Sequence, residues 1–105
     1  MPQFSVYKNR NGTTRRRFPL LLDVQSDLLE PLNSRVVVPL SPAATAKGRA
    51  MQALTPNITV AGKEYLMVTP QLAGISLREL GAIVDTVPSE RAKIIGALDL
   101  LITGV

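Results

Sequence analysis

Cationic side chains are concentrated near the N-terminus, in a window from Lys8 to Arg17 that contains no acidic residue. The cations are Lys8, Arg10, Arg15, Arg16 and Arg17. A guanidinium presents its N–H donors as a fork that matches the oxygens of a phosphate or a carboxylate. The window therefore favours an anionic partner. The alternative is a hairpin loop whose charges are simply solvated. Aromatic residues are sparse nearby, so a base-stacking surface is the weaker hypothesis.

Carboxylates could serve as catalytic groups or magnesium ligands, and the candidates are Asp23 with Asp27 and Glu90 with Asp99. Neither pair has a spacing that is diagnostic of such a site. The chain has no histidine and no cysteine, which removes the commonest general base and the usual zinc ligands. We therefore expect a protein that is not an enzyme, with no catalytic residue, no metal site and no cofactor.

Length and composition indicate one domain that spans residues 1–105. Hydrophobic residues make up 46% of the chain and charged residues 19%, which argues against a disordered protein and leaves room for an apolar association surface. We expect a homo-oligomer. No apolar run approaches the length of a membrane span, and the N-terminus lacks the apolar core of a signal peptide. A cytoplasmic protein without a membrane partner is expected.

The clearest helix signal runs from Ser89 to Val105, with Ser89 as the expected N-cap. At about 100° per residue, one stripe is apolar and is expected to be buried. It consists of Ile94, Ile95, Leu98, Leu101, Ile102 and Val105. A second stripe of small and polar residues is left free to bind, and it consists of Ala92, Gly96, Asp99 and Thr103. The last residues, from Thr103 to Val105, are expected to be accessible.

Short strands are predicted before this helix. The Leu20–Leu22 run is apolar on both faces, which suits a central strand or one that meets a partner subunit. The segment 41–55 indicates a weak helix or a loop, and the segment 74–84 fits a strand and a helix equally well. The predicted strands are Phe4–Val6, Phe18–Val24 and Arg35–Leu40, followed by a hairpin over Asn57–Val68 that turns at Ala61–Lys63. A small, mainly antiparallel, barrel-like sheet packed on a C-terminal helix follows from this order.

Several segments, nearly residue for residue, resemble the CcdB family of toxins that poison DNA gyrase. The resemblance runs from Gln3 to Val105. Its most specific part is Asp23-Val24-Gln25-Ser26-Asp27, and Phe4-Ser5-Val6-Tyr7, Arg35-Val36-Val37-Val38-Pro39-Leu40 and the terminal Gly104-Val105 support it.

The resemblance implies an α+β fold, a small SH3-like antiparallel barrel or sheet with a long C-terminal helix, in a homodimer whose two helix ends lie side by side. It also implies the toxin of a type II toxin-antitoxin module that serves plasmid maintenance. Such a toxin binds the A subunit of DNA gyrase and traps the cleaved DNA complex of this topoisomerase. A cognate antitoxin neutralises the toxin and represses the operon together with it, so the toxin meets DNA only through the antitoxin or gyrase.

Site residues follow from the resemblance by position. The expected gyrase-binding residues are Leu28, Leu29, Asp99, Thr103, Gly104 and Val105. For the antitoxin, the cationic window and a pliable small-residue segment are expected to make the contacts, through Lys8, Arg10, Arg15, Arg16, Arg17, Ser41, Lys47 and Arg49. The best-known family pattern has a Trp before the final Gly, which stacks on an arginine of gyrase. This chain has Thr103 there.

Two alternatives remain open. MazF-like endoribonuclease toxins are similar in fold and cut RNA with arginine and hydroxyl side chains, for which Arg15, Arg16, Arg17 and Thr14 are the candidates here. The other alternative is a homologue that has lost toxicity and acts only as an antitoxin-bound co-repressor.

Overall fold

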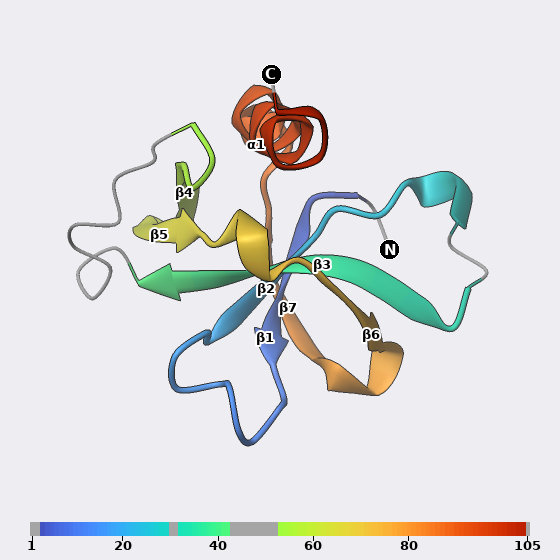
Figure 1. Cartoon of the computed structure of the whole chain (residues 1–105). Helices are drawn as coiled ribbons and strands as arrows, with labels where there is room; N and C mark the ends of the chain where they lie inside the picture. The colour runs from blue at the N-terminus through green and yellow to red at the C-terminus, as the bar shows by residue number, and fades with distance from the viewer. Residues whose placement is uncertain (1–2, 30–31, 43–52, 105) are drawn as a thin grey trace.

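The computed structural model describes residues 3–29, 32–42 and 53–104 (Figure 1). These residues form a curled, mainly antiparallel sheet and one C-terminal helix, α1, that packs on one side of it. This is the α+β architecture expected from the sequence. The strands are β1 (Ser5–Asn9), β2 (Leu20–Asp23), β3 (Ser34–Pro42), β4 (Asn57–Val60), β5 (Lys63–Met67), β6 (Ala73–Ser76) and β7 (Leu80–Thr86).

Strand β3 is the centre of the sheet and its longest strand. Along one edge it pairs with β2, and along the other it pairs first with β6 and then with β5. The strand order is β4-β5-β3-β2-β1-β7, so the first and last strands of the chain lie side by side. Between the two outer strands, the amide of Ala61 donates to Oδ2 of Asp85 at 2.8 Å, which draws the sheet toward a barrel.

The predicted hairpin over residues 57–68 is confirmed as β4 and β5. Its turn residues, Ala61 and Gly62, both have positive φ, at 49° and 81°. A tight hairpin turn of this hand requires positive φ at its two central positions, which glycine adopts at no steric cost. Gly62 therefore fixes the register that pairs Val60 with Lys63.

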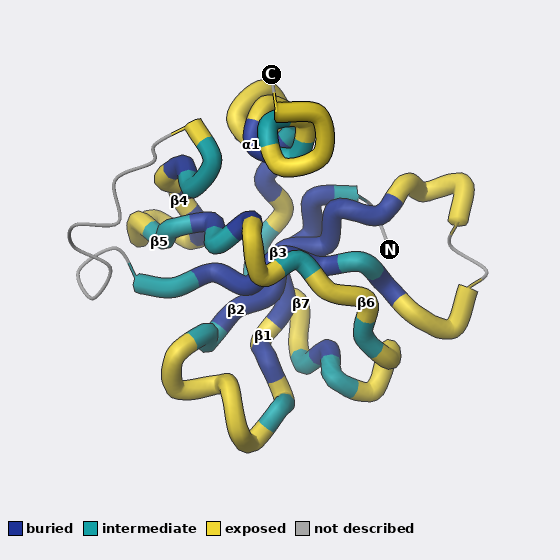
Figure 2. Tube along the Cα trace, in the orientation of Figure 1, coloured by how far each residue is buried: buried dark blue, intermediate teal, exposed yellow. Residues whose placement is uncertain are grey.

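The main core lies between the concave face of the sheet and α1, as the dark central strands of Figure 2 show. The fully buried side chains include Val6, Leu22, Val38 and Leu40, contributed by the three central strands. On the other face of the sheet a smaller cluster, consisting of Tyr7, Leu21, Val37 and Leu80, is also buried. The Leu20–Leu22 run is therefore apolar on both faces because each face carries a core of its own.

The ambiguous segment 74–84 is resolved mainly as strand. It contains the end of β6, a short 3-10 helix η4 (Leu77–Glu79) and the beginning of β7. The remaining 3-10 helices are η1 (Asp27–Leu29), η3 (Thr69–Gln71) and η5 (Pro88–Glu90). Of the segment 41–55, Ser41 and Pro42 continue β3, and residues 43–52 lie outside the described residues.

Helix α1 spans Arg91–Thr103, slightly less than expected, because Pro88–Glu90 form η5 instead. The expected N-cap at Ser89 is wrong. Glu90 occupies that position without a side-chain capping bond, and its carboxylate instead accepts the amide of Thr59 at 2.9 Å. Gly104 ends the helix with φ of 76°, and its amide donates to the carbonyl of Leu100.

The apolar stripe of α1 is buried only over its first half, contrary to expectation. Ile94 is fully buried and Ile95 and Leu98 are half-buried, but Leu101 is 38% and Ile102 75% exposed. The physical reason is that the core beneath the helix ends before its last turn. The small and polar stripe is exposed along its whole length, as expected. Within the described part of the chain, no helix is long and apolar enough to cross a membrane.

Candidate functional site

The loop between β1 and β2, residues 10–19, carries most of the cationic window and is held in a defined shape by two asparagines. Nδ2 of the Asn9 side chain donates to Oγ1 of Thr14 and to the carbonyl of Phe18, at 3.0 and 2.9 Å. Oδ1 of Asn11 accepts the backbone amides of Thr13 and Thr14. Hydrogen bonds of this kind fold the loop back on itself, so the cations are displayed from a built turn.

The β1–β2 loop is also tied to η4, which is distant in sequence. Nδ2 of Asn11 donates to Oε1 of Glu79 at 3.1 Å, and the amide of Arg10 donates to the carbonyl of Glu79 at 3.0 Å. Gly81 allows this close approach, because a Cβ there would lie 3.0 Å from the carbonyl oxygen of Lys8.

A pocket of about 210 Å³ opens between the loop, η4 and β6, and we call it the loop pocket. Its polar walls are formed by residues of β1, the loop, η3 and η4, namely Asn9, Asn11, Thr14, Gln71 and Glu79. The apolar surface comes from Phe18 and from the second face of the sheet, through Leu21, Val37, Pro39, Ala73 and Ile75.

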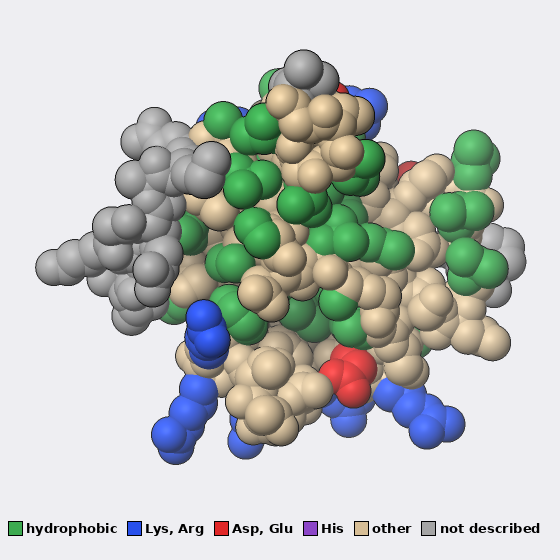
Figure 3. Space-filling view, viewed as in Figure 1, with side chains coloured by type: hydrophobic (Ala, Val, Ile, Leu, Met, Phe, Trp, Pro, Cys, Tyr) green, Lys and Arg blue, Asp and Glu red, His purple; other side chains and the backbone are tan. Residues whose placement is uncertain are grey.

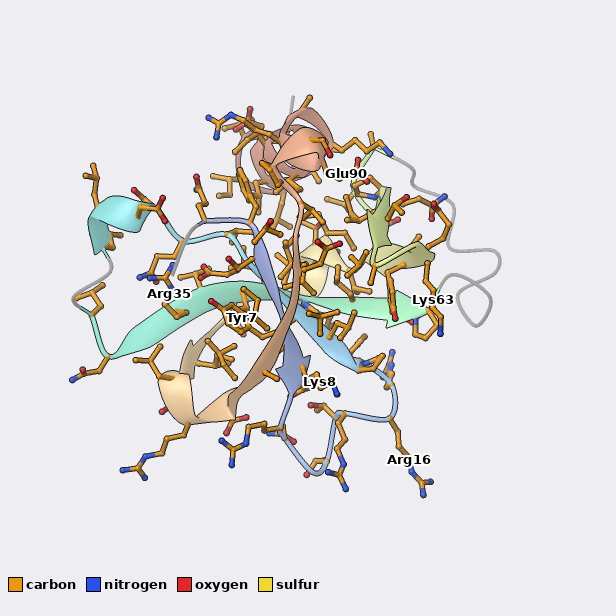
Figure 4. All side chains as sticks on the ribbon, turned by 180° about the vertical axis from the view of Figure 1, so that it is seen from behind. Tyr7, Lys8, Arg16, Arg35, Lys63 and Glu90 are labelled. Carbon is orange, nitrogen blue, oxygen red and sulfur yellow. The ribbon has the colours of Figure 1, made fainter. Side chains whose placement is uncertain are left out.

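The cations of the window surround this pocket. Lys8, Arg10, Arg15 and Arg17 are exposed and directly adjoin lining residues in the chain, and Arg16, which is also exposed, lies between Arg15 and Arg17. Arg78, which the sequence analysis did not single out, joins them because it precedes Glu79 on η4. Figure 3 shows Lys and Arg side chains gathered at this end of the molecule, and in Figure 4 Lys8 and Arg16 both lie there. The predicted cationic surface is thus a rim around a pocket.

The expected gyrase-binding residues lie away from this basic end. Asp99, Thr103 and Gly104 are exposed on the last turns of α1, and Val105 lies outside the described residues. Leu28 is 90% exposed and Leu29 47% exposed on η1. Figures 1 and 4 show η1 to one side of α1, so a single chain does not bring the two parts of this set together.

Of the expected antitoxin-binding residues outside the loop, Ser41 is half-buried near the end of β3. Lys47 and Arg49 lie outside the described residues.

The carboxylates considered as candidate ligands do not meet. Asp23 is fully buried and bound to Arg35, with 2.9 Å between Nε and Oδ2. Asp27 is exposed and accepts the amide of Gln3 at 2.6 Å. Among the described residues, no group of three or more His, Cys, Asp or Glu side chains could hold a metal ion.

The sequence model of the CcdB protein matches residues 3–104, nearly the whole chain. The chain belongs to the CcdB family. Since this family consists of toxins of toxin-antitoxin systems, the protein is a toxin of that kind. The matched range includes the DVQSD run, the β1–β2 loop and the whole of α1.

Two solved mycobacterial structures share the fold of this CcdB-family protein. One is named an endoribonuclease in complex with its cognate antitoxin, with a TM-score of 0.74, 17% identity and coverage of 98% of this chain and 95% of that chain. The other is named an endoribonuclease, with a TM-score of 0.69, 17% identity and coverage of 98% and 91%.

The expectation that the protein is not an enzyme is contradicted by these structures, because the proteins that share its fold are named as RNA-cleaving enzymes. The absence of histidine was the reason for that expectation. It was insufficient because a hydroxyl and a carboxylate, from Thr14 and Glu79, line the loop pocket beside exposed arginines without any histidine.

Sequence reasoning missed Asn9, Asn11 and Glu79 as site residues. Asn11 and Glu79 are 68 positions apart, and only the pairing of the first strand with the last brings them together. The asparagines on either side of Arg10 were a usable signal, because asparagine in a polar loop commonly bonds to nearby backbone amides.

Proposed function

We propose that this protein is a gyrase-directed toxin that binds the A subunit of DNA gyrase through the end of α1 and traps the cleaved DNA complex. The observation that carries the proposal is the family match, which extends through α1 to residue 104. The geometry supports it, because Ile102, Thr103 and Gly104 are exposed at the helix end. Leu28 and Leu29 on η1 offer a second apolar contact.

A homodimer would complete this surface, with the exposed half of the α1 stripe providing apolar area for association. The cationic rim would bind an acidic cognate antitoxin, and toxin and antitoxin together would repress their operon. The chain 1–105 would act as one domain in the cytoplasm, where the gyrase it targets works.

The test of the gyrase proposal is a supercoiling assay with variants of the helix end. Deletion of Val105 and the substitution Gly104→Glu should abolish inhibition, since they remove or charge the proposed contact. The matched control is Gly104→Asn, because asparagine tolerates the left-handed conformation of Gly104 and adds no charge. Thermal melting should show all variants folded. Full inhibition by folded Val105-deleted protein would rule out the helix end as the contact.

RNA cleavage is the second candidate function, and the loop pocket with its arginine rim is the observation that favours it. Arg15, Arg16 and Arg17 would stabilise the negative charge that develops on a phosphate during cleavage. The hydroxyl of Thr14, which accepts a bond from Asn9, still has its own hydrogen to donate to a phosphate oxygen.

Incubation of the pure protein with RNA, and separately with gyrase and plasmid DNA, distinguishes the two candidates. Cleavage of RNA that is lost in Thr14→Val and retained in Gly104→Glu supports the second function. Gyrase inhibition with the opposite pattern supports the first. Absence of both activities in folded protein would leave the role of a non-toxic antitoxin-bound co-repressor.

A further inference from the structure

The loop pocket combines a small volume with walls of two kinds. Its volume of about 210 Å³ lies below the roughly 300–1,000 Å³ of pockets for drug-sized ligands, so it suits one base or one side chain. The apolar part, formed by Phe18, Leu21, Val37, Pro39 and Ile75, offers surface against which a flat ring can pack. The guanidinium of Arg17 lies over the Phe18 ring, 5.1 Å from its centre, and so brings a cation next to this apolar surface.

The polar wall offers donors as well as acceptors, and among the described lining residues its carboxylate is that of Glu79. Asn9 uses its amide on Thr14 and Phe18, and one amide hydrogen of Asn11 goes to Oε1 of Glu79. Among the described residues, Oε2 of Glu79 has no hydrogen-bond or ion-pair partner, and a carboxylate has about four acceptor positions in all. Glu79 therefore offers several acceptor positions side by side in a half-buried wall.

Charge divides the site into an interior that holds the carboxylate of Glu79 and a cationic rim. The rim, with Arg10, Arg15, Arg16, Arg17 and Arg78, attracts anions and repels a cationic side chain. Inside, Glu79 repels an acidic group, and an apolar side chain would leave the polar wall unpaired at a cost in binding free energy. The best match is a neutral flat group with adjacent N–H donors, attached to a chain of phosphates.

We propose that the loop pocket binds a guanine base of single-stranded RNA, with Glu79 as the residue that selects guanine. The Watson–Crick edge of guanine carries N1–H beside an N2 amino group, and a carboxylate can accept both. Adenine has no N–H at N1 and leaves one of these acceptors without a partner. The arginines of the rim would contact the phosphates on either side of the base. This proposal rests on the RNA-directed candidate for its biological use, but base binding is measurable without cleavage.

Calorimetric titration of the full-length protein with 5′-GMP and 5′-AMP tests the pocket directly. GMP should bind more tightly by at least about tenfold, the discrimination typical of one well-formed bidentate base contact. Glu79→Gln should remove most of this preference, since a glutamine presents only one acceptor oxygen. The matched control, Glu64→Gln on the hairpin β4–β5, should keep it, because Glu64 bonds to Thr59 and lies outside the pocket.

Binding of pentanucleotides with a central guanine shows whether the base comes from RNA, from DNA or from a free nucleotide. The RNA should bind more tightly than GMP, and more tightly than the DNA of the same sequence. The triple variant of Arg15, Arg16 and Arg17 to Ser should weaken oligonucleotide binding but keep the preference of GMP over AMP. Binding of DNA as tight as that of RNA would overturn the RNA assignment.

Equal binding of GMP and AMP, or an unchanged preference in Glu79→Gln that melts at the parental temperature, would overturn the guanine site. The guanine site would also be overturned if an acidic peptide shifted the side-chain amide NMR signals of Asn9 and Asn11 and GMP shifted neither. The pocket would then bind a protein partner. Selective GMP binding without RNA cleavage would reject the second candidate function and leave this proposal standing.

Discussion

The guanidinium of Arg35 lies against the carboxylate of Asp23 inside the protein, with Nε 2.9 Å and Nη2 2.6 Å from Oδ2. Both side chains are fully excluded from solvent. The other carboxylate oxygen accepts the amide of Gln25, and the side chain of Gln25 in turn binds Leu29 and Val36. The most specific sequence run of the family, DVQSD, therefore links this buried ion pair to the exposed η1.

Breaking this ion pair should be strongly destabilising. Asp23→Ala or Arg35→Ala should each lower the free energy of unfolding by about 3–5 kcal/mol, because the remaining charge stays buried without its partner. Replacing both residues by apolar ones, Asp23→Leu with Arg35→Met, should recover a large part of that loss. Urea denaturation measures all three variants. Single substitutions that cost under about 1 kcal/mol would show that the pair is not desolvated as the structure has it.

The stability that depends on Asp23 should change with pH. Burial raises the pKa of the Asp23 carboxyl above its ordinary value of 3.8, and the hydrogen bond from Arg35 offsets only part of this effect. The folded state then holds the proton more tightly than the unfolded state. This contribution is complete below about pH 3.8 and is lost as the pH rises through the raised pKa.

Unfolding free energies of the parent and Asp23→Asn across this pH range test the sign. The free energy of the parent minus that of the variant should fall as the pH rises from 3.8 to neutral. A difference that rises over the same range would mean that the Arg35 charge outweighs burial.

Substitutions along α1 should separate stability from association. Ile94→Ala should cost about 2–5 kcal/mol of unfolding free energy, because the side chain is fully buried in the core. Ile102→Asp should change the stability of the isolated chain by less than about 0.5 kcal/mol, because the residue is 75% exposed. In sedimentation, the parent should have twice the chain mass of 11.3 kDa, and Ile102→Asp should be monomeric. A parent that sediments as a monomer would reject the dimer.

Antitoxin binding should depend on the cationic rim. Replacing Arg15, Arg16 and Arg17 by Ser should weaken binding of an acidic antitoxin and reduce its dependence on salt, since exposed charges steer oppositely charged partners. Surface plasmon resonance at several ionic strengths gives both quantities. Lys63→Ser, on the hairpin β4–β5, is a control at another exposed cation, and it should leave affinity and salt dependence as they are.

The missing aromatic residue at position 103 gives a gain-of-function test. Thr103→Trp should strengthen gyrase binding by about 0.5–2 kcal/mol if its ring stacks on a guanidinium of gyrase. Thr103 is exposed, so a larger side chain displaces no core atoms. Inhibition of supercoiling over a concentration series measures the change. Thr103→Phe is the matched comparison and should give a smaller gain in affinity than Thr103→Trp. If Thr103→Leu gives the same gain as Thr103→Trp, the effect comes from apolar contact alone.

Patterns within short segments predicted much of the fold. The valine run gave β3, Gly62 gave the hairpin turn, and the helical period gave α1 to within a few residues. Each of these features depends on neighbours along the chain. The segment 74–84 stayed ambiguous because its apolar residues fit two periods, and pairing of β6 with β3 and of β7 with β1 decided the outcome.

Features that depend on contacts between distant parts of the chain could not be predicted from the sequence. Periodicity treats all residues of a stripe alike, so it could not show that Ile94 is buried and Ile102 exposed. The arginine window was visible, but the pocket it surrounds needs Glu79, which another part of the chain supplies. The composition likewise excluded catalysis by histidine. It could not exclude catalysis by arginine and hydroxyl side chains that a folded loop brings together.

The position of β1 between β2 and β7 limits when the protein becomes active during its synthesis. β1 ends at Asn9, and its partner β7 ends at Thr86. At a translation rate of about 5–20 residues per second, roughly 4–15 s separate these two residues on the ribosome. Incomplete chains lack β7 and α1, so they cannot close the sheet or present the helix end. Each ribosome therefore completes the fold in a nearly all-or-none step, and a chain terminated before β7 lacks the strand that closes the sheet beside β1.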